Sequence, residues 1–355
     1  MKSRDNKVFV TDRLDSKLHS ESIPFGGKIE LTHGCNLKCK HCFIPQKNNI
    51  PELKTSDFIR LIDEIHAAGT FSLCFTGGEP FLREDFLDIY SYARRKGFFI
   101  SIFTNATLIT GAVAKELCAL PPQNIEVTLN GITEDIYEGV TGVKGSFKKA
   151  MEAIYIMRDK RLPVTVKANG MKINRSQILE IKKFSERVLG KSRFRCDLVI
   201  YPGLNGSKEP LSLRLSEEEI MDILYKNEDM RSSFVNIFCN AEHSPWLEGD
   251  FLFLCGLNTF QIDPWGRLRI CPFLKDSYED LAETGFLEGF RRLRANLRSL
   301  KFETDSRCRG CELARNCLQC PGRALAEGGS MEKPVEFFCS LAHKHAEKVK
   351  ELTRT

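Results

Sequence analysis

The sequence predicts an α/β fold built from six strand-plus-helix units, followed by a small cysteine-rich domain. Apolar strand-like segments alternate with helical patterns six times between residues 28 and 225. The first strand begins at residue 28 and the last at 194, so each unit takes about 33 residues, the length of a βαβ unit. After residue 254 the alternation stops and cysteines accumulate. Six units are two short of a closed eightfold barrel.

The expected strands are short runs of apolar, β-branched and aromatic residues. They lie at 28–31, 72–75, 99–103, 125–129, 164–167 and 194–200. Several are apolar almost throughout, as is typical of parallel strands buried on both faces. The helices between them are expected at 56–68, 85–96, 110–119, 146–158 and 177–189, and a sixth begins near Ser216. Gly69, Gly97 and Gly190 follow helical patterns at the C′ position.

These patterns divide the chain into five parts. They are a polar lead-in (1–27), the strand-plus-helix units (28–225), a linker (226–254), the cysteine-rich domain (255–345) and a C-terminal tail (346–355).

Composition narrows the class of protein. The 355 residues carry a net charge of +5, without a Lys/Arg block interleaved with aromatics that would favour nucleic acid. The start lacks the apolar core of a signal peptide, and no apolar run reaches the ~18 residues of a membrane span. Fourteen clustered cysteines in an unsecreted chain indicate metal binding, so we expect a cytoplasmic protein.

Three cysteines follow the first expected strand. Cys35, Cys39 and Cys42 have the spacing C-x3-C-x2-C. Three thiolates on one loop suit an iron–sulfur cluster, which normally takes four protein ligands, so one iron is left for another ligand. Zinc is the alternative. A structural zinc site is normally closed by a fourth Cys or His at short spacing, and His41 could not easily turn back onto the same ion.

Together with Gly77-Gly78-Glu79-Pro80 after the second strand, this triplet resembles the radical S-adenosylmethionine (SAM) superfamily over residues 28–215. The resemblance implies a partial (β/α)6 barrel of the TIM type, with functional loops at the carboxyl ends of the strands. It also implies SAM on the open iron of one 4Fe–4S cluster, cleaved to a 5′-deoxyadenosyl radical. In that family the Gly-Gly-Glu motif meets the SAM amino group, a role carried here to Gly77, Gly78 and Glu79.

Four further residues match SAM-contacting positions of the family. His41 stands where relatives have an aromatic residue near the adenine; an exposed loop histidine is the alternative. Asn105, Thr128 and Asn130 match motifs that contact the ribose and the methionine carboxylate. The arginine that many relatives carry farther along is absent, and Val140-Thr141 occupies that region. The group that holds the carboxylate is therefore left unassigned.

The C-terminal cysteines are similar to the SPASM domain, which carries auxiliary clusters in peptide-modifying radical SAM enzymes. That resemblance implies two auxiliary 4Fe–4S clusters. One takes Cys308, Cys311, Cys317 and Cys339, and the other takes Cys255, Cys271 and Cys320. The spacing before Cys320 is one residue shorter than in the family. The second cluster lacks a fourth ligand, which leaves an open iron or recruitment of Cys239. A seven-cysteine zinc domain is the alternative.

Two smaller interpretations concern single residues. Cys74, Cys118 and Cys196 are interpreted as buried core cysteines. Asp263 and Trp265 are interpreted as a turn between hairpin strands, with Asp263 as a candidate proton acceptor for a substrate radical.

The function expected from these motifs is hydrogen abstraction from a peptide or protein, giving a thioether, a carbon cross-link or an oxidised side chain. The expected partners are that substrate, a separate peptide-recognition protein, and an electron donor such as flavodoxin or ferredoxin, with no nucleic acid and no membrane. The alternatives are tailoring of a small molecule or cofactor, as in haem or quinone maturation, and a zinc-stabilised binding module.

Overall fold

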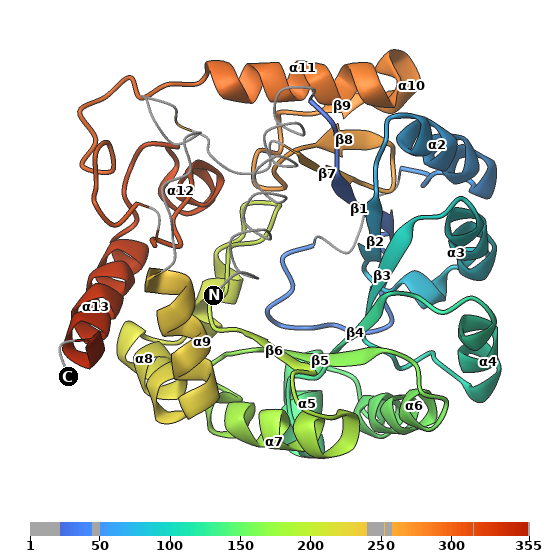
Figure 1. Cartoon of the computed structure of the whole chain (residues 1–355), viewed down its shortest axis with the longest axis horizontal. Coiled ribbons are helices and arrows are strands. Elements are labelled where there is room, and N and C mark those ends of the chain that lie inside the picture. Colours follow the sequence, from blue (N-terminus) through green and yellow to red (C-terminus); the bar gives the residue numbers. More distant parts are fainter. Residues whose placement is uncertain (1–21, 45–49, 240–251, 253–257, 315, 354–355) are drawn as a thin grey trace, which may run out of the picture.

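The computed structural model describes residues 22–44, 50–239, 252, 258–314 and 316–353. Its parallel strands form a curved sheet, and the helices that connect them lie on the outside of the curve (Figure 1). We call the concave side of this sheet the lumen. The six expected strands form adjacent members of one sheet. They are β1 (Gly26–Thr32), β2 (Ser72–Gly77), β3 (Phe99–Thr104), β4 (Asn124–Thr128), β5 (Val164–Asn169) and β6 (Phe194–Asp197).

The six expected helices are also present. They are α2 (Thr55–Ala67), α3 (Phe86–Arg95), α4 (Gly111–Ala119), α6 (Ser146–Asp159), α7 (Ile178–Leu189) and α8 (Glu217–Lys226). Local signals explain their limits: Thr110 caps α4 through the Val113 amide, and Ser216 forms a capping box with Glu219 at the start of α8. The partial-barrel prediction is therefore confirmed.

The core lies between the outer face of the strands and the helices. Ile29 and Leu31 of β1 are fully buried there, against α2 residues such as Phe58 and Ile62. Because side chains alternate along a strand, Lys28 and Glu30 point to the opposite face, into the lumen. This alternation gives the barrel an apolar outer layer and a polar interior.

The sheet continues into the cysteine-rich region, which the sequence analysis treats as a separate domain. β7 (Thr259–Ile262) pairs in parallel with β1, and β8 (Arg267–Arg269) and β9 (Glu279–Asp280) follow antiparallel. Gly27 allows this pairing, since a Cβ there would lie 2.1 Å from the Phe260 ring. Over the part of the chain that the structure describes, the sheet thus has nine strands, in the order β6-β5-β4-β3-β2-β1-β7-β8-β9.

Further elements surround this sheet. Two helices that the sequence analysis does not include are α5 (Glu134–Thr141) and α9 (Glu228–Cys239), the latter inside the expected linker. The C-terminal region contains α10 (Leu281–Thr284), α11 (Phe286–Ser299), α12 (Pro321–Gly328) and α13 (Glu336–Thr353), so the boundary placed at 345/346 falls inside α13. Short 3-10 turns occur at Pro80–Leu82, Arg175–Gln177 and Glu209–Leu213.

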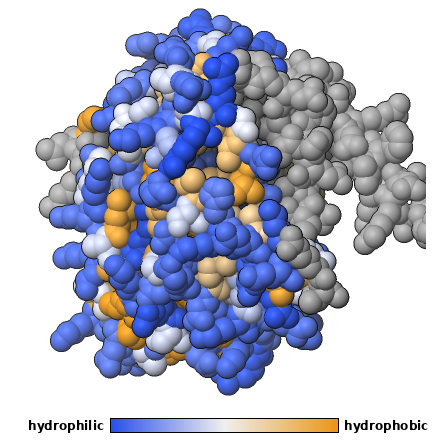
Figure 2. All heavy atoms as spheres, turned by 90° about the vertical axis from the view of Figure 1, so that its left-hand side faces the viewer, coloured by the Kyte–Doolittle hydropathy of each residue, from blue (hydrophilic) through white to orange (hydrophobic). Residues whose placement is uncertain are grey.

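The face formed by the C-terminal elements is mostly hydrophilic, with small scattered apolar spots among the atoms drawn in colour (Figure 2). Among the described residues, no helix combines the length and apolarity needed to cross a membrane.

Arg214 joins the barrel to the C-terminal helices. Its guanidinium donates two hydrogen bonds to the Glu327 carboxylate of α12, at 2.7 and 2.6 Å, and one to the Ile200 carbonyl at 2.8 Å. It also lies 4.4 Å from the centroid of the Phe337 ring. Both charged side chains are largely buried, so each depends on the other for compensation.

Replacing Arg214 with methionine is expected to lower the free energy of unfolding by about 3–5 kcal/mol, because Glu327 is then a buried charge without its partner. Urea denaturation followed by circular dichroism measures this. The matched control is Arg292→Met, which breaks an exposed α11 pair with Glu288 and should cost about 0–1 kcal/mol. Equal losses in the two variants would contradict this account of Arg214.

Candidate active site at the carboxyl ends of the strands

The three cysteines after β1 lie on one loop at the mouth of the barrel. All three are partly buried, and burial raises the pKa of each thiol, that of Cys39 to about 12. The neighbouring thiols also raise the pKa of Cys39, so the three side chains are close together. Yet no group of three His, Cys, Asp or Glu side chains in the described part of the chain is arranged to hold a single metal ion.

The turn after β2 holds one side of this loop. The Gly78 amide donates to the Thr32 carbonyl at 2.7 Å, and the Glu79 amide donates to the Gly34 carbonyl at 2.9 Å. The contact is so close that a Cβ on Gly78 would lie 2.1 Å from the Gly34 oxygen. Gly77 adopts a φ of 133° and meets the Thr32 backbone in the same way. Both glycines are thus needed for packing against the cysteine loop.

Helix α5 holds the other side. The last carbonyls of a helix have no partner within the helix. Here the Lys38 amide donates to the Thr141 carbonyl at 2.8 Å, and the Lys40 amide donates to the Val140 carbonyl at 3.1 Å. The helix ends at Gly142 in the left-handed conformation. In the sequence, the start of this helix is marked by Thr133 followed by two acidic residues, and its end is marked by Gly142.

Glu79 is fully buried behind the loop. Its carboxylate accepts hydrogen bonds from the Thr104 hydroxyl and the Asn105 amide, each at 2.7 Å, and from the Phe81 amide at 3.2 Å. Burial raises its pKa to about 7, although these three donors act in the opposite direction. The carboxylate therefore links the carboxyl ends of β2 and β3, immediately beside the cysteines.

An amide network next to Cys35 includes residues that the motifs did not identify. The Asn105 side chain donates to Asn36 Oδ1 at 2.9 Å and lies 3.8 Å from Cys35 Sγ. The Asn36 side chain donates to the Thr107 hydroxyl at 2.8 Å. Asn36 lies within the cysteine motif itself, at a position where sequence spacing alone does not distinguish a site residue from a loop residue.

His41 lies against the ends of β4 and β5. Its Nε2 accepts from the side-chain amides of Asn130, at 3.4 Å, and Asn169, at 3.2 Å. This assignment places the proton on Nδ1, which is buried. Burial, followed by the nearby Lys167 charge, lowers the pKa of His41 to about 4, so the ring is neutral at pH 7. The exposed-loop alternative is therefore wrong, and Asn169 is a neighbour that the sequence analysis missed. Thr128 is the last residue of β4.

Comparison with known proteins identifies the domain to which this site belongs. Residues 29–185 match the family model of the radical SAM superfamily. They are a radical SAM domain. This domain indicates an iron–sulfur enzyme, and the family that it matches implies SAM and one 4Fe–4S cluster.

The relatives and solved structures extend the likeness beyond this domain. An AdoMet-dependent heme synthase of Oleidesulfovibrio alaskensis is 25% identical over 86% of this chain and 85% of its own. A PqqA peptide cyclase of Bradyrhizobium diazoefficiens is 28% identical over 50% of this chain and 47% of its own. SuiB of Streptococcus suis, solved with its precursor peptide SuiA, has the same fold over 96% of this chain and 82% of its own, with a TM-score of 0.71 and 18% identity. The chain spans about half the length of several curated relatives that it matches.

Outside the radical SAM domain, one group of C-terminal cysteines lies together. Charges on Cys308, Cys311 and Cys339 raise the pKa of Cys317, although burial is the larger cause, so these four thiols are neighbours. Gln319 donates to Cys308 Sγ at 3.4 Å. This is the group expected to bind one auxiliary cluster, a role that stays a prediction.

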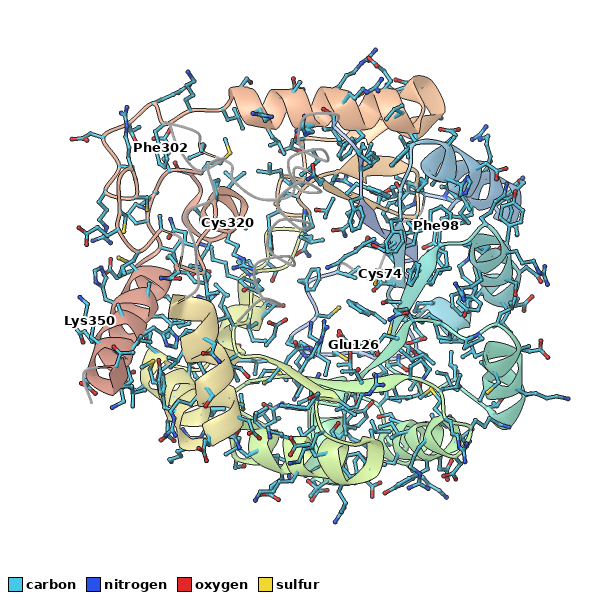
Figure 3. All side chains as sticks on the ribbon, viewed as in Figure 1. Cys74, Phe98, Glu126, Phe302, Cys320 and Lys350 are labelled. Carbon is cyan, nitrogen blue, oxygen red and sulfur yellow. The ribbon has the colours of Figure 1, made fainter. Side chains whose placement is uncertain are left out.

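The second group is only partly described. Cys320 immediately precedes α12 (Figure 3), and Cys271 Sγ lies so close to Gly322 that a Cβ there would be 2.6 Å away. Cys255 and the side chain of Cys239 lie outside the described residues. The ligands of a second auxiliary cluster therefore remain as predicted from the sequence.

Two interpretations of single residues have clear outcomes. Asp263 forms the expected turn between β7 and β8: it accepts from the Trp265 and Arg267 amides at 3.0 Å and from Arg269 at 2.6 Å. Its proposed catalytic role stays a prediction. Burial raises the pKa values of Cys74 and Cys196 to about 12, whereas Cys118 is exposed on α4. The core interpretation was therefore wrong for Cys118, which lies on the solvent-facing side of an outer helix.

A single methyl group at Gly78 is expected to abolish cluster binding by the radical SAM domain without removing a thiolate. Gly78→Ala places Cβ against the Gly34 carbonyl and displaces the loop that carries Cys35. Anaerobically reconstituted protein should lose about four irons per chain. Gly111→Ala, in open space at the start of α4, is the control and should keep them. Full iron content in both variants would show that the close contact is unimportant.

Proposed function

We propose that this protein modifies a peptide or protein substrate by radical SAM chemistry. The site at the carboxyl ends of the strands carries this proposal, because its three neighbouring thiols lie on a loop that is held from both sides. Two comparisons support a peptide: a relative is named as a peptide cyclase, and a structure with the same fold was solved with a precursor peptide.

The residues present fit the cofactors that the family implies. Cys35, Cys39 and Cys42 supply three ligands of a cluster, and Gly77 and Glu79 border the same space. Bound there, the reduced cluster and SAM supply a 5′-deoxyadenosyl radical that abstracts hydrogen from the substrate. A reducing cytoplasm and an electron donor such as flavodoxin or ferredoxin suit this requirement. A separate peptide-recognition protein remains part of the proposal.

The chain's own residues orient and enclose the reactants. The neutral His41 ring is held by Asn130 and Asn169, and its Nδ1 proton is buried. Asn105 places its side-chain amide beside Cys35. Glu79 offers a buried carboxylate for the SAM ammonium group, since ionising it next to a cation offsets its desolvation. We assign Gly78, Thr128 and these residues to SAM binding. The two C-terminal cysteine groups are proposed to hold auxiliary clusters.

Tailoring of a tetrapyrrole is the second candidate function. It is favoured by the heme synthase relative, whose alignment covers 86% of this chain and so extends beyond the radical SAM domain. The chemistry of SAM cleavage is the same in both candidates, so only the substrate separates them.

The cysteine loop is tested by the triple variant Cys35→Ala, Cys39→Ala, Cys42→Ala. With three clusters in the native protein, iron should fall from about twelve to about eight per chain. 5′-Deoxyadenosine formation with dithionite should cease. Cys118→Ala is the matched control, because this exposed thiol belongs neither to the cysteine loop nor to the two C-terminal cysteine groups. SAM cleavage by the triple variant would sink the central proposal.

Glu79→Gln should weaken SAM binding by about ten- to a hundredfold at pH 8, the usual value of a charge-assisted hydrogen bond. Below pH 7 the carboxyl of the native enzyme is protonated and neutral, so its SAM affinity should fall as the pH decreases through about 7. The variant lacks this carboxyl, so the fall in affinity that Glu79 causes should be absent, whereas the α-amino group of SAM, with a usual pKa of about 7.7–8.0, titrates with both proteins. Calorimetric titrations from pH 6 to 8 measure both. Parallel profiles would remove Glu79 from the SAM site.

The substrate is tested by mass spectrometry. The protein is co-expressed with any short peptide encoded beside its gene, and each such peptide expressed without the protein is the control. A mass loss of about two hydrogens, dependent on Cys35, Cys39 and Cys42, supports peptide modification. Unmodified peptides together with turnover of a coproporphyrin would favour the second candidate.

A further inference from the structure

The lumen of the barrel contains an unusual set of charged side chains. Barrel interiors are normally filled by layers of bulky branched side chains. Here Glu126 of β4 is almost fully buried. Figure 3 shows Glu126 and Cys74 of β2 inside the ring of strands. Lys167 of β5 lies 3.9 Å from Glu126 and 3.0 Å from Asp197, and Arg195 of β6 lies 3.6 Å from Glu126. The two carboxylates therefore already have two cations.

Lys28 is a third cation at this level. It belongs to β1, which is paired on both sides, by β2 and β7, yet its side chain is exposed. Its inner-face position means that this exposure is to the lumen. No described carboxylate forms an ion pair with it; its Nζ lies 6.0 Å from the Phe103 ring centroid. Lys28 lies opposite Cys74 in the pairing of β1 with β2. Burial raises the pKa values of Cys74 and Glu126, and the charge of Lys28 acts in the opposite direction on both.

The next inward-facing residue of β1 toward the cysteine loop is Glu30, which forms no described ion pair with Lys28. Glu30 accepts from Gln261 at 2.5 Å and lies 2.7 Å from His33 Nε2. The described ion pairs of the inner face thus use Lys167 and Arg195 but not Lys28, whose positive charge is left for a ligand.

Apolar surface lies on the same wall. Phe99 shares the inner face of β3 with Phe103, and it is 46% exposed. It stacks on Phe71, also 46% exposed, with ring centroids 4.4 Å apart. A ligand whose carboxylate reaches Lys28 would find aromatic surface next to it.

We propose that Lys28 binds a carboxylate of the substrate inside the barrel, while Phe99 and Phe103 contact an apolar or aromatic part of the same molecule. This inference rests on the proposed function and specifies its substrate class. An acidic side chain of a peptide and a propionate of a tetrapyrrole both present this chemistry, and the test separates them.

The test measures ligand affinity of the SAM-loaded, reconstituted enzyme by anaerobic calorimetry. The probes are N-acetyl-Phe-Glu-amide, its Phe-Gln counterpart, and coproporphyrin III. The variants are Lys28→Gln and Lys28→Arg, and the control is Lys149→Gln, an exposed lysine on the outer helix α6. Each protein is also assayed for dithionite-driven 5′-deoxyadenosine formation.

For a peptide substrate, the Glu probe should bind about three- to tenfold more tightly than the Gln probe. That preference should vanish in Lys28→Gln and persist in Lys28→Arg and Lys149→Gln. If Lys28→Gln weakens coproporphyrin binding and no protein prefers the Glu probe to the Gln probe, the site is supported with a tetrapyrrole as its ligand. Affinities that are unchanged in Lys28→Gln, or no binding of any probe, overturn the proposal. If the native enzyme forms no 5′-deoxyadenosine, the proposed function is contradicted instead.

Discussion

The site depends on how closely the turn after β2 approaches the loop after β1. Two backbone hydrogen bonds and the absence of a side chain at Gly78 bring these segments into contact. On the far side, the last carbonyls of α5 accept two amides from the same loop. The three thiols are therefore positioned by backbone hydrogen bonds on both sides, which fixes them more firmly than side-chain packing would. A cluster would bind to a loop that is already in place.

Burial of Glu79 extends this arrangement to β3. A carboxylate without solvent access must be fully hydrogen-bonded or neutral, and Glu79 has three donors but a pKa near 7. It thus stabilises the mouth of the barrel while remaining responsive to a nearby cation. Along the strands, the outer face packs against helices, whereas the inner face carries polar groups such as Glu126 and Lys28.

Much of the barrel could be predicted because each unit carries its own local signals. The apolar strands, the cap at Thr110 and the capping box at Ser216 are determined by neighbours in the sequence. Helix α5 was missed because it has only eight residues, although Gly142 marked its end. The pairing of β7 with β1 joins segments more than 200 residues apart, and no local pattern specifies such a contact.

By itself, the sequence determined the chemistry: the spacing of Cys35, Cys39 and Cys42, and the Gly-Gly-Glu motif, are short-range features that need no fold to be read. The tertiary structure alone decided which side chains complete the site. Asn36, Asn169 and the lumen cation Lys28 come from separate strands and loops, and only the curvature of the sheet brings them to one interior. The physical reason is that ligand spacing depends on a few covalent bonds, whereas the environment of a site depends on the packing of the whole barrel.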